Sequence, residues 1–296
     1  MSESPRTQPG ALADLLALGK PSILLLSVMM AAIGLWVAPG AIGVLPTLGL
    51  LLGTGLVVAS ANALNMVLER DVDGLMARTK NRPLPTGRMR MSTAIAFGLI
   101  TGLGGTAVLA LACNALTAWL GFGALASYVL VYTPLKQRTV WALVIGAFPG
   151  AAPPLMGYAA ATDRLDATGL VLFGILLVWQ LPHFLAIAIY RKRDYAAAGI
   201  QVAPVVRGDR AAQWEALVYA TVLVPLALAL VPLGVAGVAY GVVALGASLA
   251  FVGFHLHGFN TLPAPRWARR VFLASLAYLP ALAVGLLVDR LVGLVG

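Results

Sequence analysis

The chain has 296 residues, of which 60% are hydrophobic and only 10% are charged. A soluble globular domain carries about 25% charged residues, so this composition excludes an ordinary soluble fold and predicts a protein covered mostly by lipid. The net charge of +9 would suggest nucleic-acid binding in a soluble chain, but Lys and Arg also collect in the cytoplasmic loops of membrane proteins. We therefore expect the lipid bilayer as a partner and no nucleic acid.

Apolar stretches that could cross a bilayer as helices, which takes about 20 residues each, recur along the whole chain. We predict roughly nine of them, at 22–38, 43–66, 94–112, 115–133, 140–161, 169–190, 215–232, 234–254 and 271–288. The short breaks inside 94–133 and 215–254 predict two tight helical hairpins. Residues 1–20 are polar and lack the features of a cleaved signal peptide. The prediction is one all-α transmembrane domain over residues 1–296.

The basic residues predict how these helices are oriented. All of them except Arg164 and Arg290 fall in the N-terminal segment or in the loops near 67–93, 134–139, 191–214 and 255–270. Because cytoplasmic loops are enriched in Lys and Arg, we expect the N-terminus in the cytoplasm and the C-terminus outside. The protein would then lie in the cell's inner (plasma) membrane, with its polar chemistry on the cytoplasmic side.

The first long polar loop begins with a regular series of polar side chains. Asn62, Asn65, Glu69 and Asp73 are spaced by 3, 4 and 4 residues, which places them on one face of a helix. Asp71 would point to the opposite side if the helix continues that far. Unpaired amides are costly in an apolar segment, so this face favours a functional site over simple interfacial solvation.

A second segment repeats the same spacing near the end of another predicted helix. His183, Ala186, Tyr190 and Asp194 are again separated by 3, 4 and 4 residues. Only the spacing recurs and not the residue types, so this is at most a weak internal repeat. His183 follows a proline within the apolar stretch, where a packed histidine and a cavity histidine are equally compatible with the pattern.

Carboxylates and basic side chains together indicate a particular kind of ligand. Carboxylates hold Mg²⁺ through one or two oxygens while substrate phosphates supply others, and Lys or Arg neutralises the remaining phosphate charge. An electrostatic anchor to anionic lipid would need only the positive charges. The candidate diphosphate-binding cations are Arg78, Lys80, Arg82, Lys136, Arg138 and Arg191.

These segments resemble the UbiA superfamily of intramembrane prenyltransferases and, within it, the branch that farnesylates protohaem IX. The strings that carry the resemblance are ALNMVLERDVDGLMARTKNRPLPTGR, YTPLKQRT, GAFPGAAPPLMGY and WQLPHFLAIAIYRKRDYAAAGI. The family's first motif, an Asn followed by two Asp at four-residue spacing, falls on Asn65, Glu69 and Asp73, with Glu69 in place of an Asp. In the second motif only Asp194 keeps a carboxylate, and His183 stands where an Asp is usual.

The resemblance implies a bundle around a central cavity and a defined reaction. Farnesyl diphosphate would ionise with the help of Mg²⁺, and its allylic cation would be attacked by the vinyl group of haem b to give haem O. Asn65, Glu69, Asp73 and Asp194 would be the catalytic residues, with the three carboxylates as metal ligands. Asn62, Asp71, His183 and Tyr190 would support the site or face the acceptor. A haem A synthase or a terminal oxidase assembly is a candidate partner.

Three other functions compete with this interpretation. A related transferase could act on an aromatic quinone precursor instead of haem. A transporter would place polar groups across the bilayer midplane and contain repeated broken helices, whereas the polar residues here gather on one side. A non-catalytic assembly factor for a haem-containing oxidase is the third alternative.

Overall fold

The computed structural model describes residues 10–40 and 42–295, and this part of the chain is helical without any β-strand. The elements are α1 Ala11–Gly19, α2 Pro21–Val37, α3 Val44–Leu68, α4 Arg70–Leu75, α5 Met91–Ala112, α6 Ala115–Ala126, the π-helix η1 Ser127–Tyr132, α7 Thr133–Leu135, α8 Ala142–Thr162, α9 Ala167–Tyr190, α10 Lys192–Ala197, α11 Ala203–Val206, α12 Asp209–Leu228, α13 Val238–Leu256 and α14 Ala264–Val295.

Among the described residues, 8 helices are long and apolar enough to cross a membrane, and a bent pair brings the number to 9. That pair is α1 and α2, which meet at an angle of 45°. The prediction of an all-α membrane bundle with about nine spans is confirmed. The helix predicted at 22–38 corresponds to α2, Pro21–Val37. The first span differs from that prediction because α1 precedes α2 through a bend at Lys20.

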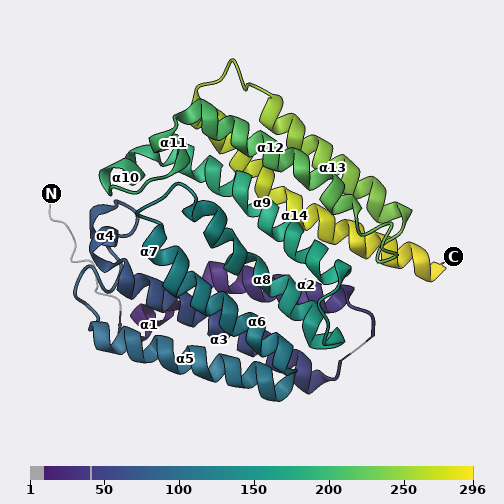
Figure 1. Ribbon diagram of the computed structural model, residues 1–296, viewed down its shortest axis with the longest axis horizontal. Helices are drawn as coiled ribbons and strands as arrows, with labels where there is room; N and C mark the ends of the chain where they lie inside the picture. The colour runs from purple at the N-terminus through teal and green to yellow at the C-terminus, as the bar shows by residue number, and fades with distance from the viewer. Residues whose placement is uncertain (1–9, 41, 296) are drawn as a thin grey trace, which may run out of the picture.

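The long helices run back and forth through the molecule, so alternate connections meet at the same end (Figure 1). The short helices α4, α7, α10 and α11 gather at one end, on the left of Figure 1, and α14 finishes at the opposite end. The polar loops predicted to share one side of the membrane therefore do lie at one end of the bundle.

The two predicted hairpins differ in their connections. Between α5 and α6 the turn is Cys113–Asn114, and the Asn114 side chain accepts a hydrogen bond from the Thr117 N–H at 2.8 Å, which caps α6. Between α12 and α13 the connection is longer than the break predicted at Pro232 and Gly234, because α13 begins only at Val238. Helix α12 starts after Gly208 and ends at Leu228, and the following turns include Gly234 with φ +70°.

Helices α2 and α8 approach each other unusually closely. A Cβ on Gly34 would lie 1.9 Å from the Pro154 carbonyl oxygen, and one on Gly157 would lie 1.9 Å from the Ala31 carbonyl oxygen. Small residues permit such contact between membrane helices, where packing replaces the hydrophobic effect as the driving force. The Gly- and Pro-rich segment of α8 is thus a packing surface.

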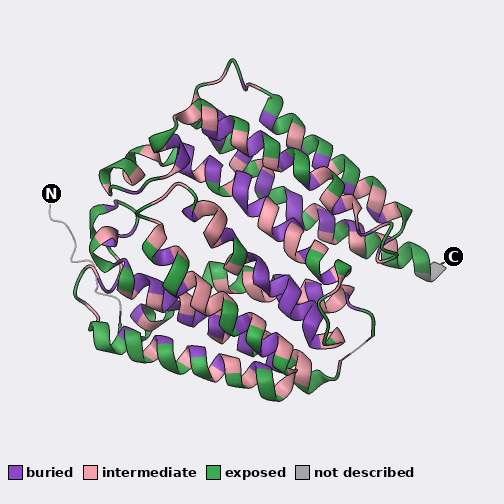
Figure 2. Cartoon of the chain, in the orientation of Figure 1, coloured by how far each residue is buried: buried purple, intermediate pink, exposed green. Residues whose placement is uncertain are grey.

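Burial increases from the periphery to the centre of the bundle. Helices α8 and α9 are the most enclosed spans, whereas the span Ala115–Leu135 and helices α5 and α13 have the smallest share of buried residues (Figure 2). The exposed surface is apolar, as Leu111 at 89% and Val238 at 78% exposure illustrate. Such a surface is stable only against lipid, so the polar cavity described below opens from a lipid-covered bundle.

Candidate active site

A cavity of about 230 Å³ lies near the end of the bundle where the short helices gather. Polar and aromatic side chains from both halves of the chain line it. They include Lys20, Asn65, Glu69, Asp73, Arg78, Arg82, Tyr128, Tyr132, Lys136, Phe184 and Tyr195. Six of these, Asn65, Glu69, Asp73, Arg78, Arg82 and Lys136, are residues that the sequence predicts for the site.

The polar series of the first loop forms a buried stripe. Helix α3 ends at Leu68, Glu69 departs from helical geometry with φ −96° and ψ 8°, and α4 begins at Arg70. Asn62, Asn65, Glu69 and Asp73 are all 4% exposed or less. Asp71 is exposed, as expected from its position on the other side of the helix, and it does not line the cavity.

Both buried carboxylates carry a basic partner. The Lys136 ammonium lies 2.9 Å from Glu69 Oε1 and 3.0 Å from Oε2, and Arg82 Nη1 lies 2.6 Å from Asp73 Oδ2. Burial by itself would lower the pKa of Lys136, but the charge and hydrogen bond of Glu69 outweigh it and raise the pKa. Lys136 therefore stays cationic at neutral pH, facing the cavity.

Asn65 connects three elements at the cavity wall. Its Oδ1 accepts a hydrogen bond from Lys20 Nζ at 3.1 Å, and its Nδ2 donates to Thr133 Oγ1 at 3.2 Å. Asn62 does not reach the cavity, and its Nδ2 donates to the Gly19 carbonyl at 3.0 Å, which fixes the end of α1. Because Gly19 directly precedes Lys20, Asn62 helps to position Lys20 without lining the cavity itself.

Lys20 is a cavity residue that the sequence reasoning missed. It lies between α1 and α2 with φ +50°, a left-handed conformation that costs a residue with a side chain about 1 kcal/mol. Strained backbone of this kind concentrates at functional sites. The available signal was a single lysine directly before Pro21, ahead of an apolar span.

Tyr128 and Tyr132 were also missed, because their position depends on a π-helix. Residues Ser127–Tyr132 widen the helix at the end of α6, and π-helical turns occur frequently at functional sites. The two rings lie 5.0 Å apart between centroids. The Tyr132 ring also fills the space above Gly146, where a Cβ would lie 2.5 Å from it.

The remaining predicted residues lie outside this cavity. Lys80, Arg138, Arg191 and Tyr190 are exposed and absent from its lining. Asp194 lies on α10, 3.6 Å from Arg191, although the next residue, Tyr195, does line the cavity.

The structure therefore does not gather the three predicted metal carboxylates. Among the described residues no three His, Cys, Asp or Glu side chains form a group that could hold a metal ion. Helix α10 begins after Arg191, as α4 begins after Glu69, and each short helix has six residues. The two segments of equal spacing thus share a backbone shape, but only the first one buries its carboxylates.

The donor set of the first segment suits magnesium. Mg²⁺ prefers hard oxygen ligands and is usually held by one or two carboxylates together with substrate phosphates. Glu69 and Asp73 supply two carboxylates from consecutive turns, and the Asn65 amide oxygen lies on the same stripe. These residues fit a metal that arrives with a diphosphate, since they do not form a complete protein cage.

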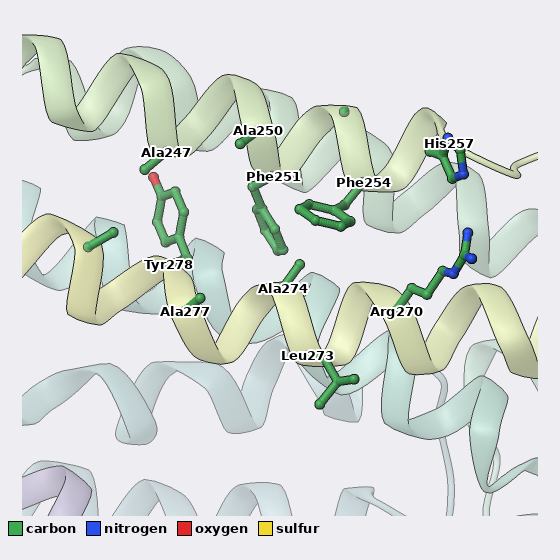
Figure 3. A pocket seen from close by; sticks show the side chains of 12 residues that line it. Ala247, Ala250, Phe251, Phe254, His257, Arg270, Leu273, Ala274, Ala277 and Tyr278 are labelled. Carbon is green, nitrogen blue, oxygen red and sulfur yellow. The ribbon is translucent and has the colours of Figure 1, made fainter.

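A larger groove of about 930 Å³ lies elsewhere, between α13 and α14 (Figure 3). Its lining is alanine and aromatic side chains, with His257 and Arg270 at one end. The Tyr278 hydroxyl is already hydrogen-bonded to Ser248 Oγ at 2.9 Å. No carboxylate lines this groove, so its size does not make it the site of metal and diphosphate chemistry.

Residues 26–276 match the model of the UbiA prenyltransferase family, and the chain belongs to this family. It is 43% identical to the protoheme IX farnesyltransferase of Myxococcus xanthus over 290 residues, covering 98% of this chain and 99% of the relative. It is 47% identical to the enzyme of the same name from an Anaeromyxobacter species, covering 96% of each chain.

The fold resembles solved structures of the family at much lower identity. A digeranylgeranylglyceryl phosphate synthase superimposes with a TM-score of 0.80 at 18% identity, covering 94% of this chain and 98% of the other. A UbiA homologue from Archaeoglobus fulgidus, solved with DMAPP and Mg²⁺, superimposes with a TM-score of 0.70 at 17% identity, covering 92% and 99%.

Proposed function

We propose that this chain transfers the farnesyl group of farnesyl diphosphate to a vinyl group of haem b, giving haem O. The observation that carries the proposal is the buried pairing of Glu69 with Lys136 and of Asp73 with Arg82 in one cavity. A cavity with both signs of charge suits a metal diphosphate, whereas a purely lipid-anchoring surface needs one sign. The acceptor follows from the relatives named protoheme IX farnesyltransferase, which match nearly the whole chain.

Glu69 and Asp73 would hold Mg²⁺, with Asn65 beside them. Bound there with the diphosphate, the ion would neutralise charge on the departing group. Lys136 and Arg82 already contact the two carboxylates, so they are placed to bind diphosphate oxygens next to those carboxylates. Lys20 and Arg78 add positive charge to the same cavity.

Asp194 belongs to the opposite wall in this proposal. It lies on α10 beside Tyr195, which lines the cavity, and its pair with Arg191 is partly exposed. We assign it to the metal diphosphate from the α10 side, with Arg191 as an outer contact. Lys80 and Arg138 are exposed and lie within two residues in sequence of basic residues that line the cavity. They would attract the anionic substrate at longer range.

The reaction breaks the C1–O bond of farnesyl diphosphate, and the diphosphate leaves with the electron pair. The vinyl group of haem b forms the new C–C bond to C1, and water adds to the resulting cation with loss of a proton, leaving a hydroxyethylfarnesyl group. Donors aimed at the developing negative charge stabilise the leaving group. Tyr128, Tyr132 and Phe184 line the cavity, and their rings would shield the allylic cation from water and stabilise it through their faces.

The membrane setting completes the proposal. Nearly all basic residues lie at the end of the bundle that contains the cavity, so the positive-inside rule assigns that end to the cytoplasm. The protein would lie in the inner (plasma) membrane with its N-terminus inside and its C-terminus outside. Its product would pass to a haem A synthase or a terminal oxidase assembly.

The test is a product assay with a matched pair of variants. Purified protein in detergent receives haem b, farnesyl diphosphate and Mg²⁺, and products are identified by mass spectrometry, with EDTA as the control. We expect haem O only when Mg²⁺ is present. Asp73→Asn should lower kcat at least about 100-fold, an effect of the size seen when one electrostatic contact to a transition state is removed.

Asp71→Asn is the control, because Asp71 lies two residues away but is exposed. It should keep near-normal activity. Prenylation of 4-hydroxybenzoate in place of haem b would overturn the acceptor, while haem O formation that is unaffected by Asp73→Asn would overturn the site.

A further inference from the structure

The groove between α13 and α14 is closed on its inner side by fixed contacts. Near its middle the Ser248 and Tyr278 hydroxyls are hydrogen-bonded at 2.9 Å, and the Phe251 and Tyr278 rings pack with centroids 5.3 Å apart. At one end Trp267 Nε1 donates to the His255 carbonyl at 2.8 Å. Each of these residues is 2% exposed or less. The distance between the two helices is therefore set behind the groove.

The outer side of the groove stays unfilled because its side chains are small. A Cβ added at Gly253 would meet nothing within 4 Å. The hollow of about 930 Å³ lies toward the upper end of the range of about 300–1,000 Å³ that is usual for ligand pockets. Most of this lining is glycine and alanine, namely Ala247, Ala250, Gly253, Ala274, Ala277 and Ala281.

The groove extends across about half of a bilayer. Its lining runs from Ala247 to His257 on α13 and from Arg270 to Ala281 on α14. At about 1.5 Å per residue, each stretch is roughly 15 Å long, which is half of the about 30 Å of a hydrocarbon core. The groove therefore fits within a single leaflet, the one beside the end of the bundle where His257 and Arg270 lie (Figure 3).

This end of the groove carries positive charge. His257 and Arg270 are exposed there on opposite helices, and Arg266 and Arg269 are exposed within a turn of Arg270. None of the three arginines takes part in an ion pair within the described part of the chain, and no carboxylate lines the groove. Arginine binds phosphate oxygens through its planar fork, so this end is complementary to a phosphate.

The opposite face of α14 is already occupied by α9. Ser275 Oγ lies 2.7 Å from His183 Nδ1, and Trp179 Nε1 donates to the Ser275 carbonyl at 2.9 Å. His183 is thus a packed residue of the contact between α9 and α14, and it lines neither the diphosphate cavity nor the groove. The groove is separate from the diphosphate cavity, with which it shares no lining residue.

We propose that this groove binds one anionic phospholipid of the adjacent leaflet, with its phosphate at His257 and Arg270 and an acyl chain along the alanine-lined hollow. Phe254 and Leu273 line the groove while 49% and 56% exposed, so the chain would cover apolar surface. Basic pockets between transmembrane helices on the cytoplasmic side bind such head groups. A zwitterionic lipid would bring its own positive charge toward the arginines, so the head group provides the selectivity.

The test measures lipid binding to delipidated protein in detergent by native mass spectrometry, with dioleoyl phosphatidylglycerol and dioleoyl phosphatidylcholine as probes. Wild type should bind one phosphatidylglycerol at least about fivefold more tightly than phosphatidylcholine, the preference expected from one basic residue beside an anionic lipid. Arg270→Gln should abolish this preference. Arg90→Gln is the control and should keep it, because Arg90 is exposed directly before α5 and does not line the groove.

Ala250→Leu and Ala277→Leu test the hollow without changing its charge. Both alanines are exposed, so the thermal-unfolding midpoint without added lipid should match wild type. Phosphatidylglycerol binding should fall about tenfold, because excluding two methylene groups of the acyl chain already costs that much. Ala107→Leu, at an exposed alanine of α5, should leave binding unchanged.

Several outcomes would overturn the proposal. Equal affinity of wild type for the two lipids, or the same loss of preference in Arg90→Gln as in Arg270→Gln, refutes a selective site. Displacement of the lipid by inorganic phosphate would show that only the anion is recognised. Displacement by haem b that Ala250→Leu prevents would assign the groove to the acceptor instead. Haem O formation is measured separately, and its presence or absence decides the proposed function and not the lipid site.

Discussion

The contact between α2 and α8 allows a sharp test of how packing positions the active site. In Gly157→Ala the new Cβ would lie 1.9 Å from the Ala31 carbonyl oxygen and 2.7 Å from the Leu35 nitrogen. Ordinary contacts begin near 3.4 Å, so the helices must separate by 1.5 Å (3.4 minus 1.9). Overpacking typically costs about 1–3 kcal/mol, and the cost should reach the upper end here because both obstructing atoms belong to backbone.

We expect a net destabilisation of about 2 kcal/mol, since alanine recovers about 1 kcal/mol of this cost in helix propensity. At about 2 °C per kcal/mol for a chain of this size, the midpoint in a detergent thermal-unfolding assay should fall by about 4 °C. Activity should fall as well, because α2 carries Lys20 at its N-terminal end.

The control is Gly246→Ala on α13, where a Cβ meets nothing within 4 Å. That variant should be as stable as wild type or slightly more stable, by up to about 1 kcal/mol. Equal stability of the two variants would refute the argument that the α2–α8 contact determines how the bundle closes.

Further predictions concern the cavity itself. Glu69→Gln and Lys136→Met should each destabilise the protein by about 2 kcal/mol, which is less than the cost of about 3–5 kcal/mol for a fully buried pair because Lys136 is partly exposed. The double variant should cost clearly less than the sum in a thermal-unfolding cycle, and additive effects would show that the pair does not interact. Lys20→Met should raise KM for farnesyl diphosphate about tenfold, equivalent to about 1.4 kcal/mol. An unchanged KM would remove Lys20 from the substrate site. Asp194→Asn should raise the Mg²⁺ concentration needed for half-maximal rate about tenfold and leave the unfolding midpoint unchanged, because its Arg191 contact is long and partly exposed. Unaltered Mg²⁺ dependence would exclude Asp194 as a metal or diphosphate contact.

Helical periodicity was sufficient to predict the inner wall of the site. Asn65, Glu69 and Asp73 share a face at a spacing that persists through the small break at Glu69, because that residue stays close to helical backbone geometry. The alternation of apolar spans and basic loops likewise predicted which end of the bundle would be polar. Both features depend on local spacing and on the length needed to cross a bilayer, which a single sequence contains.

The features that the sequence did not reveal depend on backbone irregularities or on tertiary contacts. Lys20 reaches Asn65 because of a left-handed residue between two helices, and no periodic pattern marks such a bend. Tyr128 and Tyr132 enter the cavity through a π-helix, which shifts the phase of the following residues. Asp194 shared the spacing of the first stripe, but spacing does not determine whether a short helix such as α10 packs its carboxylate inward.

In the proposed function, the charge arrangement of the cavity gives a physical reason for metal and diphosphate to bind together. Glu69 and Asp73 are already matched by Lys136 and Arg82, so a magnesium ion alone would have to compete with two cations held at contact distance in a poorly solvated space. A diphosphate gives those cations a new anionic partner and supplies the metal with further oxygens. Each component thereby lowers the electrostatic cost of the other, and the buried ion pairs keep the stripe of carboxylates in place until both arrive.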